Sequence, residues 1–246
     1  MKTLYELGRY WIFIKNLFIK PEKFGVYFKQ VVLEMTLIGY SSLGIVALVS
    51  IFMGAVITIQ TAYNLVSPAI TDDTIALVTR DTIIIEFSPT IIMLVLAGKV
   101  GSSIASELGT MRVTQQIDAL EIMGINSSGY LVLPKIVAAI FILPFVVVIS
   151  MFLGIGGGWF AGTMSGVIST ADYIVGIQDE FIPFNVLFAL TKTVVFAYII
   201  TSVSAYHGYY TDGGSLEVGK SSTKGVVYSS ILILIMDYVL TQLMLA

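Results

Sequence analysis

The chain has 246 residues, of which 57% are hydrophobic and only 12% are charged, whereas soluble domains carry about 25% charged residues. Its mean hydropathy is +0.92. The 13 Lys and Arg and the 16 Asp and Glu residues are too few to cover the water-facing surface of a soluble protein, so much of the surface must face lipid. The composition therefore predicts an all-α integral membrane protein and excludes an ordinary soluble domain.

Charge balance and cysteine content narrow the functional classes further. The formal net charge of −3 disfavours nucleic acid as a partner. No cysteine is present, which excludes disulfides, thiolate metal sites and a cysteine nucleophile. The sole histidine, His207, has no second histidine or acidic cluster to work with, so we expect no metal site and no catalytic triad.

Five apolar stretches of the sequence are long enough to cross a bilayer, which takes about 20 residues. These spans are predicted at 37–64, 82–104, 131–166, 184–206 and 225–245. The third stretch is longer than one span needs. Pro134 and Pro144 in its first half predict a kink or an interfacial extension.

Basic residues give the orientation of the spans, because Lys and Arg concentrate in cytoplasmic segments. Of the 13 Lys and Arg residues, all except Arg80 and Lys192 lie before the first span, around the second loop, or in the fourth loop. The opposite loops, 65–81 and 167–183, hold Arg80 among several acidic residues. We therefore predict a cytoplasmic N-terminus and, after five spans, a C-terminus on the outside.

The N-terminal region 1–36 is predicted to form an amphipathic helix in the interface of the inner leaflet. Apolar residues recur there at steps of three and four, at Leu4, Leu7, Trp11, Ile14 and Phe18. Pro21 would end or bend this helix, and the apolar stripe continues afterwards towards the first span. The alternative is a simple basic anchor that sets the topology, to which Lys20 and Lys23 would contribute.

Two glycine patterns invite a functional interpretation. The stretch from Gly214 to Ser221 fits the phosphate-loop pattern G-x-x-x-x-G-K-[ST], but it lies in a short loop between two spans, where the strand that this motif needs is not expected. We therefore expect a helix cap there and no nucleotide site. The glycines at 154, 158, 162 and 166 predict close helix packing, within the bundle or across a dimer, with a sliding seam as the alternative.

Ionisable residues inside apolar spans are functional candidates, because each costs at least about 2.5 kcal/mol on insertion scales. The sequence places Glu86, Lys192 and Asp237 there. Glu86 and Lys192 are both expected towards the outer side, where they would pair. The pair is either a structural link that fixes helix register or a polar lining for a pathway, and Asp237 is expected to belong to a buried polar cluster.

The cytoplasmic loop at 106–124 is expected to be helical from about Thr110 and to stop at Gly124. Its apolar side chains, such as Leu108 and Met123, are too few to span a bilayer. The residues alone leave two alternatives open: the helix lies on the membrane, or it presses into a cytoplasmic partner.

The loop sequence from Glu107 to Gly124 resembles the hallmark of the MlaE (YrbE-type) permease family, which comprises membrane subunits of MCE-associated ABC transporters. The resemblance covers most of the chain from about residue 45 and includes further short segments at 86–89, 96–102, 192–196, 208–210 and 237–241. The family commonly has an arginine before the glutamate and a glycine two positions after it. Here Ile85 and Ser88 stand at those positions.

The resemblance implies a homodimeric permease in the bacterial inner membrane, with an interfacial region at 1–36, a permease domain at 37–246, and a periplasmic C-terminus. It implies no cofactor, an MCE-domain protein as periplasmic partner, and room for a STAS-domain protein. The loop at 106–124 becomes a coupling helix that docks on a cytoplasmic ABC ATPase. The residues expected to face or support that contact are Glu107, Met111, Arg112, Gln116, Asp118 and Glu121.

The cargo implied by the resemblance is phospholipid or another hydrophobic lipid, held at the dimer interface near the outer ends of the first two spans. The expected lining residues are Ile57, Gln60, Tyr63, Asn64, Glu86 and Phe87. This mixture offers apolar surface for the chains and polar groups for the head. The alternatives are an ion-coupled secondary carrier that uses the intramembrane charges, a membrane enzyme acting through His207, and a scaffold that transports nothing.

Overall fold

The computed structural model describes residues 2–19, 24–65 and 72–245. Within these ranges all regular secondary structure is helical, and five helices are long and apolar enough to cross a membrane. These helices comprise Gly25–Asn64, Asp73–Val113, Ser127–Met164, Pro183–Tyr209 and Ser215–Met244. The predicted all-α membrane fold with five spans is confirmed.

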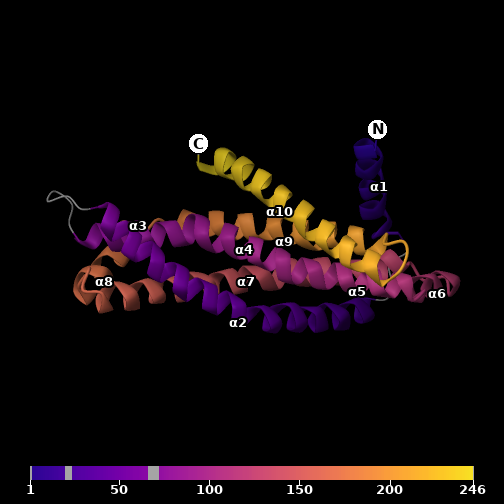
Figure 1. Ribbon diagram of the computed structural model, residues 1–246, viewed down its shortest axis with the longest axis horizontal. Coiled ribbons are helices and arrows are strands. Elements are labelled where there is room, and N and C mark those ends of the chain that lie inside the picture. Colours follow the sequence, from indigo (N-terminus) through magenta and orange to yellow (C-terminus); the bar gives the residue numbers. More distant parts are fainter. Residues whose placement is uncertain (1, 20–23, 66–71, 246) are drawn as a thin grey trace.

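Figure 1 shows how the helices are arranged. The long helices run side by side, while α10 (Ser215–Leu245) tilts away from them towards the C-terminus. The short helix α1 (Lys2–Asn16) stands across the end of the bundle that also carries α6 (Gln116–Ile122). The opposite end carries α8 (Thr170–Gln178). Two further long helices are α7 (Ser127–Met164) and α9 (Pro183–Tyr209).

The second span is a composite of several helical segments. It runs through α3 (Asp72–Thr82), η1 (Ile83–Ile91), α4 (Ile92–Leu96), η2 (Ala97–Gly101) and α5 (Ser102–Val113). The η segments are π-helical, with wider turns, and Pro89 lies inside η1. Proline has no backbone N–H to donate to the preceding turn, and a wide turn is one way to accommodate that loss.

Three spans extend beyond their predicted limits. The helix α2 (Phe24–Asn64) begins well before 37, α3 brings part of the predicted loop 65–81 into the second span, and α10 begins before 225. Hydropathy detects only the part of a helix that is apolar enough for lipid, whereas the helix itself continues into polar sequence. The phosphate-loop pattern consequently falls in the first turns of α10, and the element before it is the helix α9.

The helices α2 and α7 touch backbone to backbone. A Cβ atom added at Gly54 would overlap the Gly154 carbonyl, and one at Gly157 would overlap the Ile51 carbonyl. One at Gly158 would overlap Thr58 Oγ1. The predicted close packing therefore occurs within the chain, and α7 continues as one helix through both of its prolines.

The helix α1 has two apolar faces. Leu7, Trp11 and Phe18, all from the predicted stripe or its end, are exposed, whereas Phe13 and Leu17 are buried. The centre of the Phe13 ring lies 5.4 to 5.8 Å from the ring centres of Tyr206 and Tyr209 in α9 and of Tyr210 after it. The periodicity thus identified the outward face and missed the face that packs on α9. The predicted roles of Lys20, Pro21 and Lys23 fall outside the described residues.

Gly157→Ala and Gly156→Ala form a matched pair that tests the contact between α2 and α7. The added methyl at 157 meets the backbone of Ile51, whereas the one at 156 meets nothing within 4 Å. We expect Gly157→Ala to lower the free energy of unfolding by about 1–3 kcal/mol, the usual cost of overpacking. Gly156→Ala should be neutral or stabilising, since alanine favours helix over glycine.

The measurement is the thermal unfolding of both variants in detergent, followed by tryptophan fluorescence. Equal midpoints for the two variants would show that the helices are not in backbone contact.

Candidate functional site

A buried ion cluster joins three membrane-spanning helices. Lys192 of α9 has no exposed side-chain surface, and its Nζ lies 3.0 Å from Glu86 Oε1 and 2.8 Å from Asp237 Oδ1. Glu86 belongs to η1 and Asp237 to α10. The structure thus brings together all three intramembrane charges that the sequence singled out.

The cluster contains a further polar member that sequence reasoning missed. Thr90 Oγ1 lies 3.2 Å from Glu86 Oε2 and 2.9 Å from Asp237 Oδ1, so its hydroxyl can donate to either carboxylate. The Lys192 ammonium also lies 4.5 Å from the centre of the Phe188 ring. Thr90 follows Glu86 by four residues, a spacing that brings side chains onto one helix face and that would have identified it.

The charges of the cluster do not balance. Two carboxylates share one ammonium, which leaves one formal negative charge in excess. The Lys192 side chain is completely buried, whereas 47% of the Glu86 side chain is exposed on the described chain. The cluster therefore presents a carboxylate to whatever lies against this part of the bundle.

The predicted lining residues fall into two groups. Gln60, Tyr63 and Asn64 are exposed near the C-terminal end of α2, and Ile57 is half-buried. Phe87 is buried in the hydrophobic core. One copy of the chain thus leaves the α2 residues open, and Phe87 contributes no open surface within it.

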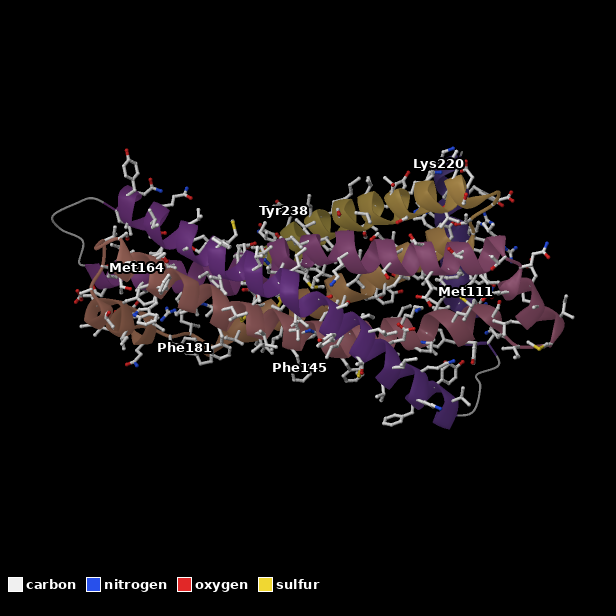
Figure 2. The ribbon with its side chains drawn as sticks, turned by 60° about the horizontal axis from the view of Figure 1, so that its bottom comes forward. Met111, Phe145, Met164, Phe181, Lys220 and Tyr238 are labelled. Atoms are coloured by element: carbon white, nitrogen blue, oxygen red, sulfur yellow. The ribbon has the colours of Figure 1, made fainter. Side chains whose placement is uncertain are left out.

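Large apolar surfaces remain exposed on α2 and α10. Only 11% of the most apolar window of α10 is buried, the smallest share among the five spans. Figure 2 shows Tyr238 on this helix, midway along the molecule. The exposed large apolar residues of α10 include Ile231, Leu234, Ile235, Tyr238 and Leu243.

The last part of the second span and the residues after it form two helices, where one continuous helix was expected from about Thr110. The helix α5 ends at Val113, and Gln115 adopts a left-handed backbone conformation with φ 59° before α6. Arg112 Nη1 lies 2.6 Å from Asp118 Oδ1, so this ion pair closes the turn. Gly124, with φ 78°, ends the segment where expected. We call α5 and α6 together the α5–α6 segment.

Two of the residues predicted to face or support a partner contact also bond to the bundle. Glu107 Oε2 lies 2.8 Å from the Nζ of the buried Lys135. Glu121 Oε1 accepts hydrogen bonds from Ser127 Oγ and Tyr209 OH, both at 2.9 Å. Glu107 and Glu121 therefore hold the α5–α6 segment against α7 and α9.

Further side chains are exposed on the α5–α6 segment beside Glu107 and Glu121, which are also exposed. Gln116 is exposed, whereas Met111 is half-buried against the core. Ile122 is 87% exposed, and Met123 beside it is also exposed. An apolar pair directly before a helix-ending glycine is the sequence signal for this exposed tip, and Ile122 is a site residue that was not predicted.

The helix α1 is tied to the same end of α9. Tyr10 OH donates to Ser202 Oγ at 2.8 Å, and Tyr206 OH donates to Glu6 Oε2 at 2.6 Å. The Arg9 guanidinium lies 3.8 Å from the centre of the Tyr210 ring.

His207 stacks on Tyr228, with ring centres 5.2 Å apart. Across the described ranges, no group of three or more His, Asp or Glu side chains is arranged to hold a metal ion.

At the opposite end, Arg80 fixes α8 to the second span. The guanidinium is buried and donates to the carbonyl oxygens of Ile177 at 2.8 Å and Asp179 at 2.6 Å. It also pairs with Asp81 at 2.9 Å. The sole basic residue of the two acidic loops is therefore a structural clamp on the C-terminus of a helix.

Comparison with known proteins places the chain among membrane permeases. Residues 31–243 match the family described as Permease MlaE. A probable ABC transporter permease protein of Rickettsia bellii is 37% identical over 97% of this chain and 92% of its own length. One from Synechocystis is 34% identical over 86% of this chain and 80% of its own length.

A plant protein is also similar. The chloroplastic protein TRIGALACTOSYLDIACYLGLYCEROL 1 of Arabidopsis thaliana is 31% identical over 88% of this chain and 62% of its own length.

Lys192→Met tests whether the ammonium holds the cluster together. The change leaves two carboxylates facing each other without a cation, so we expect a loss of about 3–5 kcal/mol in the free energy of unfolding. Asp237→Asn leaves a neutral Lys192 and Glu86 pair and should cost much less.

Thermal unfolding in detergent compares the two variants, and the triple variant Glu86→Gln, Lys192→Met, Asp237→Asn should recover much of the loss. A Lys192→Met protein as stable as the wild type would contradict this role of the ammonium.

Proposed function

Since this chain belongs to the MlaE permease family and is an ABC transporter permease, we propose that it moves phospholipid, or a related lipid, between the bacterial inner membrane and a periplasmic MCE-domain partner. A separate cytoplasmic ATPase supplies the energy. The observation that carries the proposal is the Glu86 carboxylate, exposed from a buried ion cluster amid large apolar helix surfaces. A lipid needs both kinds of surface, one for its head and one for its chains.

The name of the Arabidopsis relative supports a lipid cargo, because it includes trigalactosyldiacylglycerol, which is a galactolipid. The composition of the exposed surfaces agrees with it. Tyr63 and Gln60 are exposed on the same helix as the apolar Phe52 and Val56. Such a surface suits an amphiphile better than an ion or a sugar.

The functional unit of this proposal is a homodimer. The exposed apolar face of α10 would face lipid in a lone copy, and in the dimer it would pack against the same face of a second copy. A lipid pocket then forms between the two copies, lined by Ile57, Gln60, Tyr63 and Asn64, with Glu86 beside it. Phe87 supports this wall from the core.

The α5–α6 segment is the proposed docking surface for the ATPase. Its exposed tip, Ile122 and Met123, fits an apolar cleft on that subunit, and Gln116 lies on the same exposed segment. Arg112 and Asp118 keep the turn closed, while Glu107 and Glu121 fix the segment to the bundle. Closure of two ATPase subunits moves this segment and opens or squeezes the dimer pocket.

This function sets the topology. The N-terminus and the α5–α6 segment are cytoplasmic, and the end that carries α3 and α8 faces the MCE-domain partner. The C-terminus is periplasmic. A STAS-domain protein would act on the ATPase side.

Purification from the native host in mild detergent tests the assembly directly. We expect mass spectrometry to identify an ABC ATPase and an MCE-domain protein in the sample, and lipid extraction to yield about one phospholipid per dimer. A pure homodimer with neither ATPase nor lipid would overturn the proposal, and lipid movement without nucleotide would favour a carrier.

Ile122→Asp tests the docking surface. Charging an exposed apolar contact should weaken ATPase binding about tenfold or more, since a central interface contact is worth about 2 kcal/mol or more. The matched control is Val175→Asp, which also changes an exposed apolar position but lies in α8, at the opposite end of the bundle.

Co-purification of the ATPase with tagged permease measures the effect. Equal recovery with both variants would exclude Ile122 from the interface.

A further inference from the structure

A second buried ion cluster is centred on Lys135 and includes Glu107 of the α5–α6 segment. Lys135 of α7 has 4% of its side chain exposed, and its Nζ lies 2.6 Å from Glu34 Oε1 of α2. The same Nζ lies 2.8 Å from Glu107 Oε2 of α5. One ammonium therefore connects three different helices.

These helices form two groups by their main packing partners, and the groups meet at α9, because α7 also packs against α9. The helices α2 and α7 contact each other backbone to backbone through their glycines. In the described chain, α5 instead packs mainly against α9 and α10. Gly208 of α9 lies so close to Ala105 that a Cβ would overlap the Ala105 backbone, and Ser222 of α10 donates to the Ser102 carbonyl at 3.2 Å. Lys135 bridges the two groups.

The two arms of this bridge differ in their surroundings. The Glu107 side chain is 50% exposed, whereas that of Glu34 is 17% exposed. Two carboxylates share one cation, so either can leave while a neutral pair remains. Water can solvate the Glu107 carboxylate after its contact with Lys135 breaks, whereas the Glu34 carboxylate would stay largely buried without a partner. The Glu107 arm is thus the one that can open and reclose at low cost.

We propose that Lys135 is a positioning residue that transmits movement of the α5–α6 segment to the α2 and α7 pair, and so to the lipid pocket. The proposal rests on the proposed function, because it assumes that an ATPase moves this segment. The α2 residues at the outer end of the pocket share one continuous helix with Glu34. A displacement passed from Glu107 through Lys135 to Glu34 therefore reaches that pocket along α2.

The test uses the complete complex with its ATPase in liposomes of phosphatidylethanolamine and phosphatidylglycerol that contain a trace of fluorescent phosphatidylethanolamine. The variants are Glu107→Gln, Glu34→Gln and, on a Lys135→Met background that leaves no unpaired ammonium buried, the double variant of both glutamates. Each single change leaves Lys135 with one carboxylate and removes the excess negative charge, so the chain should fold. Glu217→Gln, in the exposed pair with Lys220, is the matched control.

We expect each single variant to hydrolyse ATP at the normal rate but to transfer about fivefold less lipid per ATP, the size of a typical coupling between sites. Links in series fail together, so the double variant should transfer no less than the worse single variant. Glu217→Gln should match the wild type.

Lys135→Arg, which offers two donors to two carboxylates, should retain transfer better than Lys135→Met. Normal transfer per ATP in both single variants would overturn the proposal, and so would additive losses in the double variant. A wild-type complex without ATP-dependent transfer would instead refute the proposed function, which keeps the two failures distinct.

Discussion

An ammonium group cannot remain in the apolar centre of a membrane bundle without partners, and Lys192 therefore constrains the helices around it. Its two carboxylates come from the second and fifth spans. Asp237 is the main charged tie that keeps α10 against the bundle, because so little of that helix is buried. The exposed apolar face of α10 and the open Glu86 carboxylate both follow from this arrangement, and the proposed pocket depends on them.

The sequence predicted what depends on composition and periodicity. Five spans follow from hydropathy, and the cost of burying charge was enough to single out Glu86, Lys192 and Asp237. It did not predict where helices end, because α2 and α10 begin before the stretches that hydropathy detects. It also missed the break at Gln115, since a left-handed residue there is stabilised by the ion pair between Arg112 and Asp118, a contact that hydropathy does not detect.

The candidate site shows a similar division. The family resemblance located the segment at 106–124, yet it gave no direction for its side chains. Glu107 and Glu121 bond to the buried donors Lys135 and Tyr209 while their side chains stay exposed. Ile122 is exposed without such a bond. The donors Lys135 and Tyr209 lie 28 and 88 positions away from their acceptors, and spacing within the segment carries no information about them.

The two faces of α1 have a consequence for the bilayer itself. Trp11 and Phe18 lie on the outward face, while Phe13 and two hydrogen bonds fix the helix to α9. In the proposed topology, the headgroup region of the inner leaflet is thereby held at one level of the protein. A thicker or thinner membrane cannot be met by sliding the bundle along its axis. Hydrophobic mismatch must then be absorbed at the other leaflet, around α3 and α8.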